Sequence, residues 1–449
     1  MKLKPPQVVV LSFLVAIVVG VALLSLPLAY REGRTITLVD RIFTATSATC
    51  VTGLVVCDTA RDWSPFGQTV IFLLFQTGGL GIMTLSTFFA VLLGRKFTLH
   101  RDVVIHSALD HNRIYGGRRL IVSIIALTMA IEIVGALLLF LRWNYTQGWP
   151  VHEKLVKSLF HSVSAFCNAG FSLFSDSFES FQSDLYVNLV MIFLIFLGGL
   201  GFIVIFDVIR SVFSAREYRR PLLSLQSTIV LIVSVLLIVI GAVSILFLEG
   251  DNVLREMTYK DRVMGALFQA VTPRTAGFNT LPISRFTPAT LIVLMLLMFI
   301  GASPGSTGGG IKTCTFAIVI SAVWAMARNR DKVFMFGRTI PRSIVRRALV
   351  IFIVSLIWIL CATFLFVACE GKNLGTENLV VRSLFEVTSA FGTVGLSTGI
   401  TSHLSTLGKV IIVVTMFVGR VGPLTLALAV AISEEKIDYS YPEEKVMVG

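Results

Sequence analysis

Four short segments of the sequence repeat one pattern, in which apolar residues mixed with Ser or Thr are followed by a glycine and a bulky apolar residue. They cover residues 43–54, 160–171, 268–278 and 385–396, and their closing glycines are Gly53, Gly170, Gly277 and Gly395. Glycine adopts left-handed dihedrals without steric penalty, so it allows successive backbone carbonyls to face one axis. Four such strands around an axis could replace the water of a dehydrated cation. The sequence therefore predicts a cation site built from backbone oxygens.

These segments must be positioned by the apolar runs on either side of them. Each segment is too short to cross a bilayer, which takes about 20 apolar residues, and it fits a re-entrant loop between two spans. The closing glycines follow one another at intervals of 117, 107 and 118 residues, which suits one span, loop and span per interval. We expect an all-α polytopic membrane protein with eight transmembrane helices, in four parallel repeats around one pseudo-fourfold pore.

The boundaries of these repeats follow from the positions of the apolar runs and the basic linkers. We expect repeat 1 at residues 1–94, a cytoplasmic basic linker at 95–119, repeat 2 at 120–220, repeat 3 at 221–327, a second basic linker at 328–347, repeat 4 at 348–433 and a cytoplasmic tail at 434–449. Most of the 38 Lys and Arg residues then lie on one side, which the positive-inside rule assigns to the cytoplasm together with both termini.

The composition excludes an ordinary soluble domain, because 55% of the residues are hydrophobic and only 14% are charged. The net charge of +12 lies between apolar runs and not on a soluble face, so it does not favour nucleic-acid binding. We find no clustered carboxylates, no HExxH and no CxxC pattern, and expect no enzyme activity and no protein-bound metal. Whether Cys50 and Cys57 form a disulfide stays open.

A glycine-rich stretch interrupts the second span of repeat 3. The apolar region 288–327 is twice as long as a span needs, and residues 301–310 hold five glycines and Pro304, which end helices. This glycine-rich loop, taken as residues 301–313, is expected near the membrane centre, where it could act as a movable plug or be a structural kink. Its segment GSTGGGIKT misses the phosphate-binding loop by one residue. The predicted gate residues are Gly301, Gly305, Gly308, Gly309, Gly310, Lys312 and Arg420.

Charged residues at membrane depth need carbonyls, acids or water as partners. We expect Arg420 to donate to carbonyls of the glycine-rich loop, and Lys312 to share that environment. Glu132 is better explained as a helix-packing partner than as an ion ligand. Glycine clusters follow the closing glycines in register, at residues 78–81, 198–201, 301 and 419–422, and would let the second spans approach closely or bend.

The chain resembles the Trk/Ktr/HKT superfamily of potassium transporters, and within it the membrane subunits of bacterial Ktr systems. The resemblance is carried by the segments SATCVTGL (47–54), SAFCNAGFSL (164–173), QAVTPRTAGFN (269–279), SAFGTVGL (389–396), MFIGASPGSTGGGIKT (298–313) and MFVGRVGPLT (416–425). It implies potassium uptake across a bacterial cytoplasmic membrane, by a homodimer seated on a cytoplasmic nucleotide-binding ring of the KtrA/KtrC type that binds ATP or ADP. A sodium-selective or poorly selective relative is the alternative function, and sodium could also be an activator.

The same resemblance implies roles for individual residues. The four closing glycines would mark the selectivity filter, the glycine-rich loop would be the gate, and Arg420 would contact it. Serine at the position of Gly53 goes with sodium permeation in such a family. The carbonyls expected to bind potassium belong to Thr52, Gly53, Ala169, Gly170, Ala276, Gly277, Val394 and Gly395. No cofactor is expected in this chain.

Overall fold

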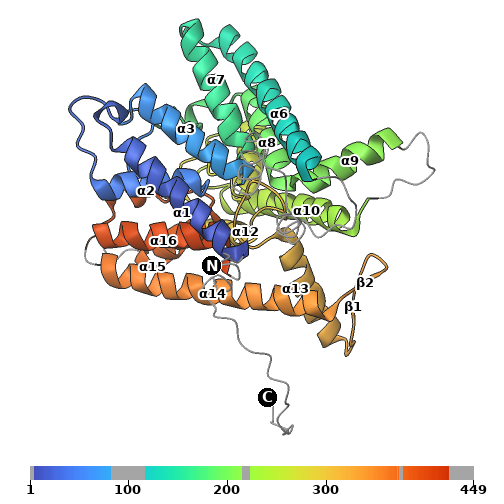
Figure 1. Cartoon of the computed structure of the whole chain (residues 1–449). Coiled ribbons are helices and arrows are strands. Elements are labelled where there is room, and N and C mark those ends of the chain that lie inside the picture. Colours follow the sequence, from blue (N-terminus) through green and yellow to red (C-terminus); the bar gives the residue numbers. More distant parts are fainter. Residues whose placement is uncertain (1–4, 82–116, 215–222, 372, 374–377, 424–449) are drawn as a thin grey trace.

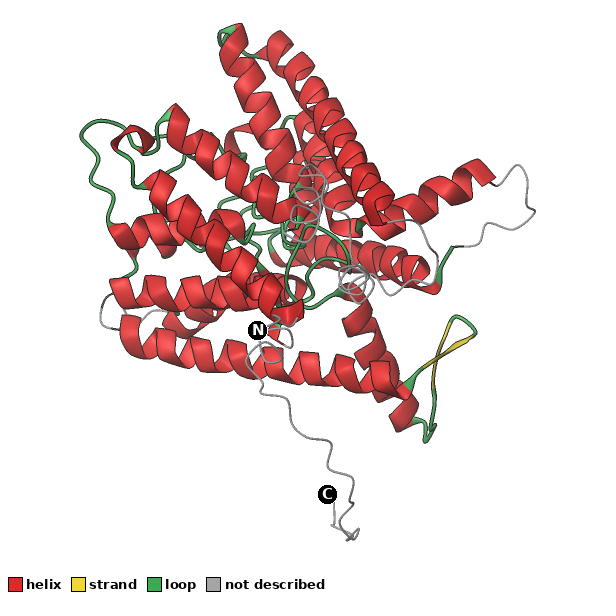
Figure 2. Ribbon diagram, in the orientation of Figure 1, coloured by secondary structure: helices red, strands yellow, loops and turns green. Residues whose placement is uncertain are grey.

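The computed structural model describes residues 5–81, 117–214, 223–371, 373 and 378–423. Its regular secondary structure is almost entirely α-helical, with loops between the helices (Figures 1 and 2). The α-helices are α1 Pro5–Leu24, α2 Leu38–Thr49, α3 Pro65–Leu80, α6 Gly117–Thr146, α7 Val151–Phe166, α8 Leu185–Leu200, α9 Phe202–Ser214, α10 Leu225–Leu248, α11 Tyr259–Val271, α12 Pro288–Phe299, α13 Thr313–Ala327, α14 Arg342–Glu370, α15 Leu379–Gly392 and α16 Thr406–Val421. Short 3-10 turns lie at Pro27–Ala29, Glu179–Phe181, Ile283–Arg285 and Thr401–His403.

Four of the described helices, α1, α6, α10 and α14, are long and apolar enough to cross a membrane. Large apolar side chains cover their outer faces, such as Val18, 65% exposed, and Phe364, 73% exposed. Such faces suit a lipid environment and not water. The expectation of an all-α membrane protein with several apolar spans is confirmed by these helices and by the comparisons below.

One expected span is bent. The apolar run from Tyr186 to Ile209 divides into α8 and α9, whose axes differ by 102°. The break lies at Gly201, which has a φ of 86°, a conformation that costs a residue with a Cβ about 1–2 kcal/mol. The glycine cluster at 198–201, expected to let this second span approach its neighbours closely or bend, thus lies at a bend.

Four short helices, α2, α7, α11 and α15, each pack against the long helix that precedes them in the chain. The helices that follow connect neighbouring units, and the contacts close into a cycle. The pairs are α3 with α7, α8 with α11, α12 with α15, and α16 with α2. Because the first and last units also meet, as Figure 1 shows for the blue α2 and the red α16, the short helices surround a common centre.

Two buried acids join the C-terminal end of one long helix to the start of another helix by hydrogen bonds. Glu249, at the end of α10, accepts hydrogen bonds from the backbone and hydroxyl of Thr287, which precedes α12. Glu370, at the end of α14, accepts from Ser405 before α16 in the same way. The shared arrangement indicates that the part of the chain with α10 and α12 and the part with α14 and α16 have equivalent structures.

A small hairpin follows α13. Strands β1 (Val333–Met335) and β2 (Arg338–Ile340) pair antiparallel, with Val333 opposite Ile340. These two side chains are buried against Ala322 and Ala325 of α13. The hairpin therefore holds the basic segment between α13 and α14 against the end of α13.

Several expectations fall outside the described residues. They are the end of the first repeat and the first basic linker within 82–116, the basic residues of 215–222, and the tail from 424 onward.

Candidate functional site

The four closing glycines lie together and form a closed ring, called here the glycine ring. All four have positive φ, between 71° and 93°. A Cβ added to any of them would meet a carbonyl oxygen of the next strand. The added Cβ would lie 2.6 Å from the Ala169 oxygen at Gly53 and 2.9 Å from the Ala276 oxygen at Gly170. It would collide with the Val394 oxygen at Gly277 and with the Thr52 oxygen at Gly395. All eight residues whose carbonyls were expected to bind potassium therefore lie together in the glycine ring.

The residues two positions before the glycines also have positive φ. They are Val51 (56°), Asn168 (57°), Thr275 (74°) and Thr393 (49°). Each non-glycine residue in this region is strained by about 1–2 kcal/mol, so the surrounding structure must hold all four strands. Sequence reasoning missed these positions as special. Asn168 offered a weak signal, since Asn tolerates this conformation, but the β-branched Val51 offered none.

Hydroxyl groups on the short helices hold these strands. Ser47 donates to the Leu54 carbonyl at 2.7 Å, Ser164 to the Phe171 carbonyl at 2.8 Å and Thr272 to the Phe278 carbonyl at 2.6 Å. In the fourth strand the direction is reversed, because the Gly395 amide donates to Ser389 at 3.1 Å. One hydroxyl therefore ties each strand to its short helix, at the glycine itself in the fourth strand and at the residue after the glycine in the other three. The recurring Ser and Thr of the four segments were the available sequence signal.

We expect Ser164→Ala to weaken the ring, because the Phe171 carbonyl loses its donor in a buried place, at a cost of about 1–3 kcal/mol. Thermal unfolding of the purified protein should shift to lower temperature, and added potassium should protect it less. Ser234→Ala is the matched control, since the Ser234 hydroxyl is buried but has no hydrogen-bond partner among the described residues. Equal behaviour of the two variants would remove the hydroxyl from any role in holding the strand.

A cavity of about 400 Å³, called here the vestibule, opens on one side of the glycine ring and is lined by all four of its glycines. Asp58, Asp176 and Glu179 add carboxylates to its wall, among several hydroxyl groups. Burial, and then the neighbouring Asp176, raise the pKa of Glu179, whose carboxylate accepts a 2.6 Å hydrogen bond from Asn279. The carboxylates of the vestibule can therefore attract cations.

The glycine-rich loop lies against the opposite side of the ring. A Cβ at Gly308 would collide with the Thr275 hydroxyl, and one at Gly309 would collide with the Thr393 hydroxyl. Both threonines come two residues before a ring glycine. Only glycines allow the loop to approach these two strands so closely.

The bend between α8 and α9 supplies acceptors for this loop. Because α8 ends at Leu200, the carbonyls of Gly198 and Gly199 are free to accept from outside the helix. The Ser303 amide donates to Gly199 at 3.0 Å, and the Thr307 hydroxyl donates to Gly198 at 3.1 Å. The loop is thereby attached to the unit next to its own.

Two cations meet the carbonyls of the same loop. The Lys312 ammonium donates to the carbonyls of Gly308 at 2.6 Å and Gly309 at 3.3 Å. Arg420 donates from one nitrogen to the Thr307 carbonyl and from another to the Gly78 carbonyl of α3. Within the described chain, neither cation forms an ion pair with an acid. Arg420 therefore joins the loop to α3 by hydrogen bonds to backbone alone.

Other residues singled out in the sequence lie away from the ring's axis. The buried Glu132 of α6 accepts a 3.0 Å hydrogen bond from Gln76 of α3, which is the helix-packing role expected of it. Cys50 and Cys57 are both free thiols, so the open question of a disulfide between them is answered. No group of three or more His, Cys, Asp or Glu side chains that could hold a metal ion occurs in the described ranges.

Comparison with known proteins gives consistent matches along the chain. The family model TrkH, described as a cation transport protein, matches residues 7–439. The Ktr system potassium uptake protein B of Bacillus subtilis is 38% identical over 450 residues, covering 100% of this chain and 97% of that protein. The potassium/sodium uptake protein NtpJ of Enterococcus hirae is 36% identical over 451 residues, covering 100% and 98%. The crystal structure of the potassium transporter TrkH from Vibrio parahaemolyticus has the same fold, with a TM-score of 0.73 at 19% identity, covering 96% of this chain and 85% of that chain.

Proposed function

Because this multi-pass membrane protein belongs to the TrkH family of cation transport proteins and is not an enzyme, we propose that it takes up potassium through the glycine ring. The observation that carries the proposal is the closure of that ring, with a carbonyl oxygen of one strand against the glycine of the next at all four contacts. Eight carbonyls replace the hydration shell of the ion: those of Thr52, Gly53, Ala169, Gly170, Ala276, Gly277, Val394 and Gly395. The short helices direct their partly negative C-terminal ends toward the same place.

The fold proposed for this function is four parallel repeats of span, re-entrant loop and span around one pore, with eight transmembrane helices. The cycle of helix contacts and the equivalent hydroxyl bonds support it. The repeats are those expected from the sequence, at 1–94, 120–220, 221–327 and 348–433. Two such chains form a homodimer in the bacterial cytoplasmic membrane, with both termini in the cytoplasm.

The gate of this pore is the glycine-rich loop. Its contacts with Thr275 and Thr393 support the assignment, because an ion leaving the ring meets the loop next. Lys312 and Arg420 keep the loop in place through its carbonyls. The positive charge of both residues also opposes the passage of a cation while the loop is closed.

Uptake into potassium-starved cells that express this chain tests the function directly. Growth at low external potassium is measured with and without sodium. This comparison distinguishes a potassium transporter that sodium activates from a transporter that carries sodium itself. The similarity to a protein named for both ions makes a sodium-selective or poorly selective transporter the second candidate. Cells that gain sodium but no potassium would decide for this second candidate.

Regulation is proposed to come from a soluble ring of the KtrA/KtrC type that binds ATP or ADP. Two of the similar proteins are named as proteins B and D of a Ktr system, which supports a transporter made of more than one kind of subunit. The basic segment 328–347 is the proposed docking face, since α13 connects it directly to the gate loop. Opposite charges would steer an acidic ring surface to it.

We expect reversal of Arg338, Arg342 and Arg346 to glutamate to abolish copurification of the ring and nucleotide-dependent flux in liposomes. All three side chains are exposed, so the fold should persist. Arg255 and Lys260, at the other end of α10 from the hairpin, give a matched pair of reversals that should leave both readouts unchanged. Wild-type ring binding by the triple variant would exclude this segment from the interface.

A further inference from the structure

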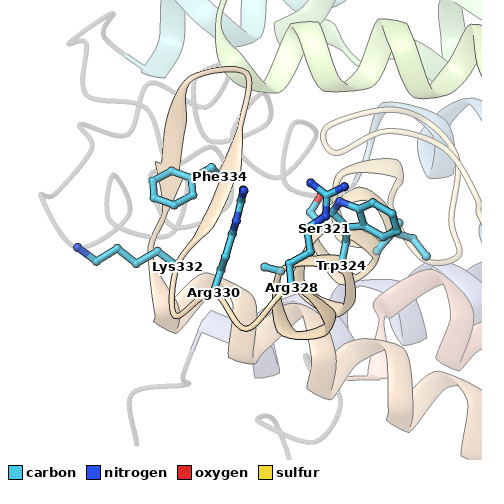
Figure 3. A pocket seen from close by; sticks show the side chains of 8 residues that line it. Ser321, Trp324, Arg328, Arg330, Lys332 and Phe334 are labelled. Atoms are coloured by element: carbon cyan, nitrogen blue, oxygen red, sulfur yellow. The ribbon is translucent and has the colours of Figure 1, made fainter.

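A second cavity, of about 210 Å³, lies where the end of α13 meets the hairpin and is called here the basic pocket (Figure 3). It is lined by Ile320, Ser321, Trp324, Ala325, Arg328, Arg330, Lys332 and Phe334. It is separate from the vestibule, since the two cavities share no lining residue. Nothing in the proposed transport path uses it.

Three cationic side chains line the basic pocket, those of Arg328, Arg330 and Lys332, and the Lys332 side chain points away from the two arginines (Figure 3). Figure 3 shows Arg328 and Arg330 extending in the same direction from the turn between α13 and β1. The Arg328 guanidinium lies 4.5 Å from the centre of the Trp324 ring, a cation–π contact. Within the described chain, Arg328, Arg330 and Lys332 have no ion pair, and the neighbouring Asp331 has none either. The pocket therefore presents three positive charges that this part of the chain does not neutralise.

Next to these charges the lining is apolar, and this apolar part continues onto the open face of α13. Ile320 is 53% exposed and Trp324 is 60% exposed, and the adjoining Val323 and Met326 are equally uncovered. Tryptophan is enriched where a membrane meets water. A ligand that fills this pocket and extends from it must therefore have a charged end and an apolar end.

We propose that the basic pocket binds the headgroup of an anionic phospholipid. The phosphate lies between Arg328 and Arg330, because guanidinium groups bind phosphate oxygens through paired hydrogen bonds, and Lys332 adds positive charge at the edge of the pocket. The acyl chains then follow the exposed face of α13 past Trp324. A free phosphate would use only the charged side, and an acidic protein surface would leave the apolar side uncovered.

The position of the site connects it to the rest of the molecule. Helix α13 begins at Thr313, directly after Lys312, and its 15 residues span about 22 Å. A lipid held at its far end fixes the helix that carries the glycine-rich loop. The binding step itself does not depend on the proposed function, since it concerns a cavity outside the transport path.

Native mass spectrometry of the purified full-length protein tests the site, with phosphatidylglycerol as the anionic probe and phosphatidylcholine as the neutral one. The variant carrying Arg328→Gln, Arg330→Gln and Lys332→Gln should bind phosphatidylglycerol roughly a hundredfold more weakly, about fivefold for each lost charge. The variant with Arg328→Lys and Arg330→Lys keeps the charge and should retain most of the binding. Phosphatidylcholine binding should be the same in all variants.

The matched control replaces Arg338, Arg342 and Arg346 with glutamine, which removes as many charges from the same segment but leaves the pocket intact. It should bind phosphatidylglycerol like the wild type. Equal losses in both triple variants would overturn the site in favour of diffuse attraction to the basic segment. Displacement of the lipid by millimolar inorganic phosphate would show a phosphate site without lipid specificity, and also overturn the proposal. The proposal would also be overturned if the variant with Arg328→Gln, Arg330→Gln and Lys332→Gln bound lipid like the wild type but lost the regulatory ring. That result would assign the pocket to a protein partner.

Discussion

Replacement of Gly53 by serine is expected to lower the preference for potassium over sodium by roughly tenfold or more. A side chain at this position meets the Ala169 carbonyl at 2.6 Å, and the φ of 85° is itself unfavourable for a residue with a Cβ. The two effects displace a ring carbonyl by a few tenths of an ångström or rotate it, and selectivity depends on where those oxygens lie. Competitive uptake of the two ions into potassium-starved cells, or flux into liposomes, measures the change.

Gly33 provides the matched control for that experiment. It has a similar φ of 81°, but a Cβ there meets nothing within 4 Å. Gly33→Ser therefore introduces the backbone strain without the collision, and selectivity should stay at the wild-type value. If well-expressed Gly53→Ser protein also keeps its selectivity, the ring is not where the ions are distinguished.

Removal of the Arg420 side chain is expected to raise potassium flux severalfold while binding of potassium persists. Arg420→Ala takes away the donors to the Thr307 and Gly78 carbonyls, so the glycine-rich loop loses its attachment to α3. A positive charge next to the ion path disappears at the same time. Deletion of two of the residues 308–310 should act in the same direction, because the shortened loop reaches less far beneath Thr275 and Thr393. Flux in liposomes without the regulatory ring is the measurement.

Arg420→Lys separates the two causes. Lysine keeps the charge but lacks the forked guanidinium that reaches both carbonyls at once, so flux should lie between the wild type and Arg420→Ala. Potassium-dependent protection against thermal unfolding should be unchanged in all three proteins, because the hydrogen bonds of Arg420 go to Thr307 and Gly78 and not to ring residues. A flux that stays constant or falls, in protein that still binds potassium, would reduce the loop to a structural kink.

The sequence was informative where a pattern recurred along it. The four glycines could be found because each ends a similar segment, and the loop because residues 301–310 carry too many glycines for a helix. Arg420 stood out because a cation inside an apolar run needs a partner. These features are local, and the structure brings all of them to one place.

What the sequence could not reveal depends on contacts between distant parts of the chain. The pairing of Gln76 with Glu132 and the attachment of Thr307 to Gly198 join residues from different units, and nothing local encodes them. The positive φ of Val51 runs against the preference of its own residue type, so only the assembled ring explains it. Gly201 showed that a bend was allowed, but its 102° angle depends on the loop that fills the space beside it.

The closed ring has a consequence for how variation acts on this protein. In a pore made from four copies of one subunit, every substitution appears four times and the symmetry is preserved. Here a single chain supplies all four strands, so each substitution changes one quarter of the ring and leaves three quarters as they were. Mutation can therefore change one of the four repeats at a time. The four repeats already differ in this way, because the glycine-rich loop belongs to repeat 3 and Arg420, which donates to it, belongs to repeat 4.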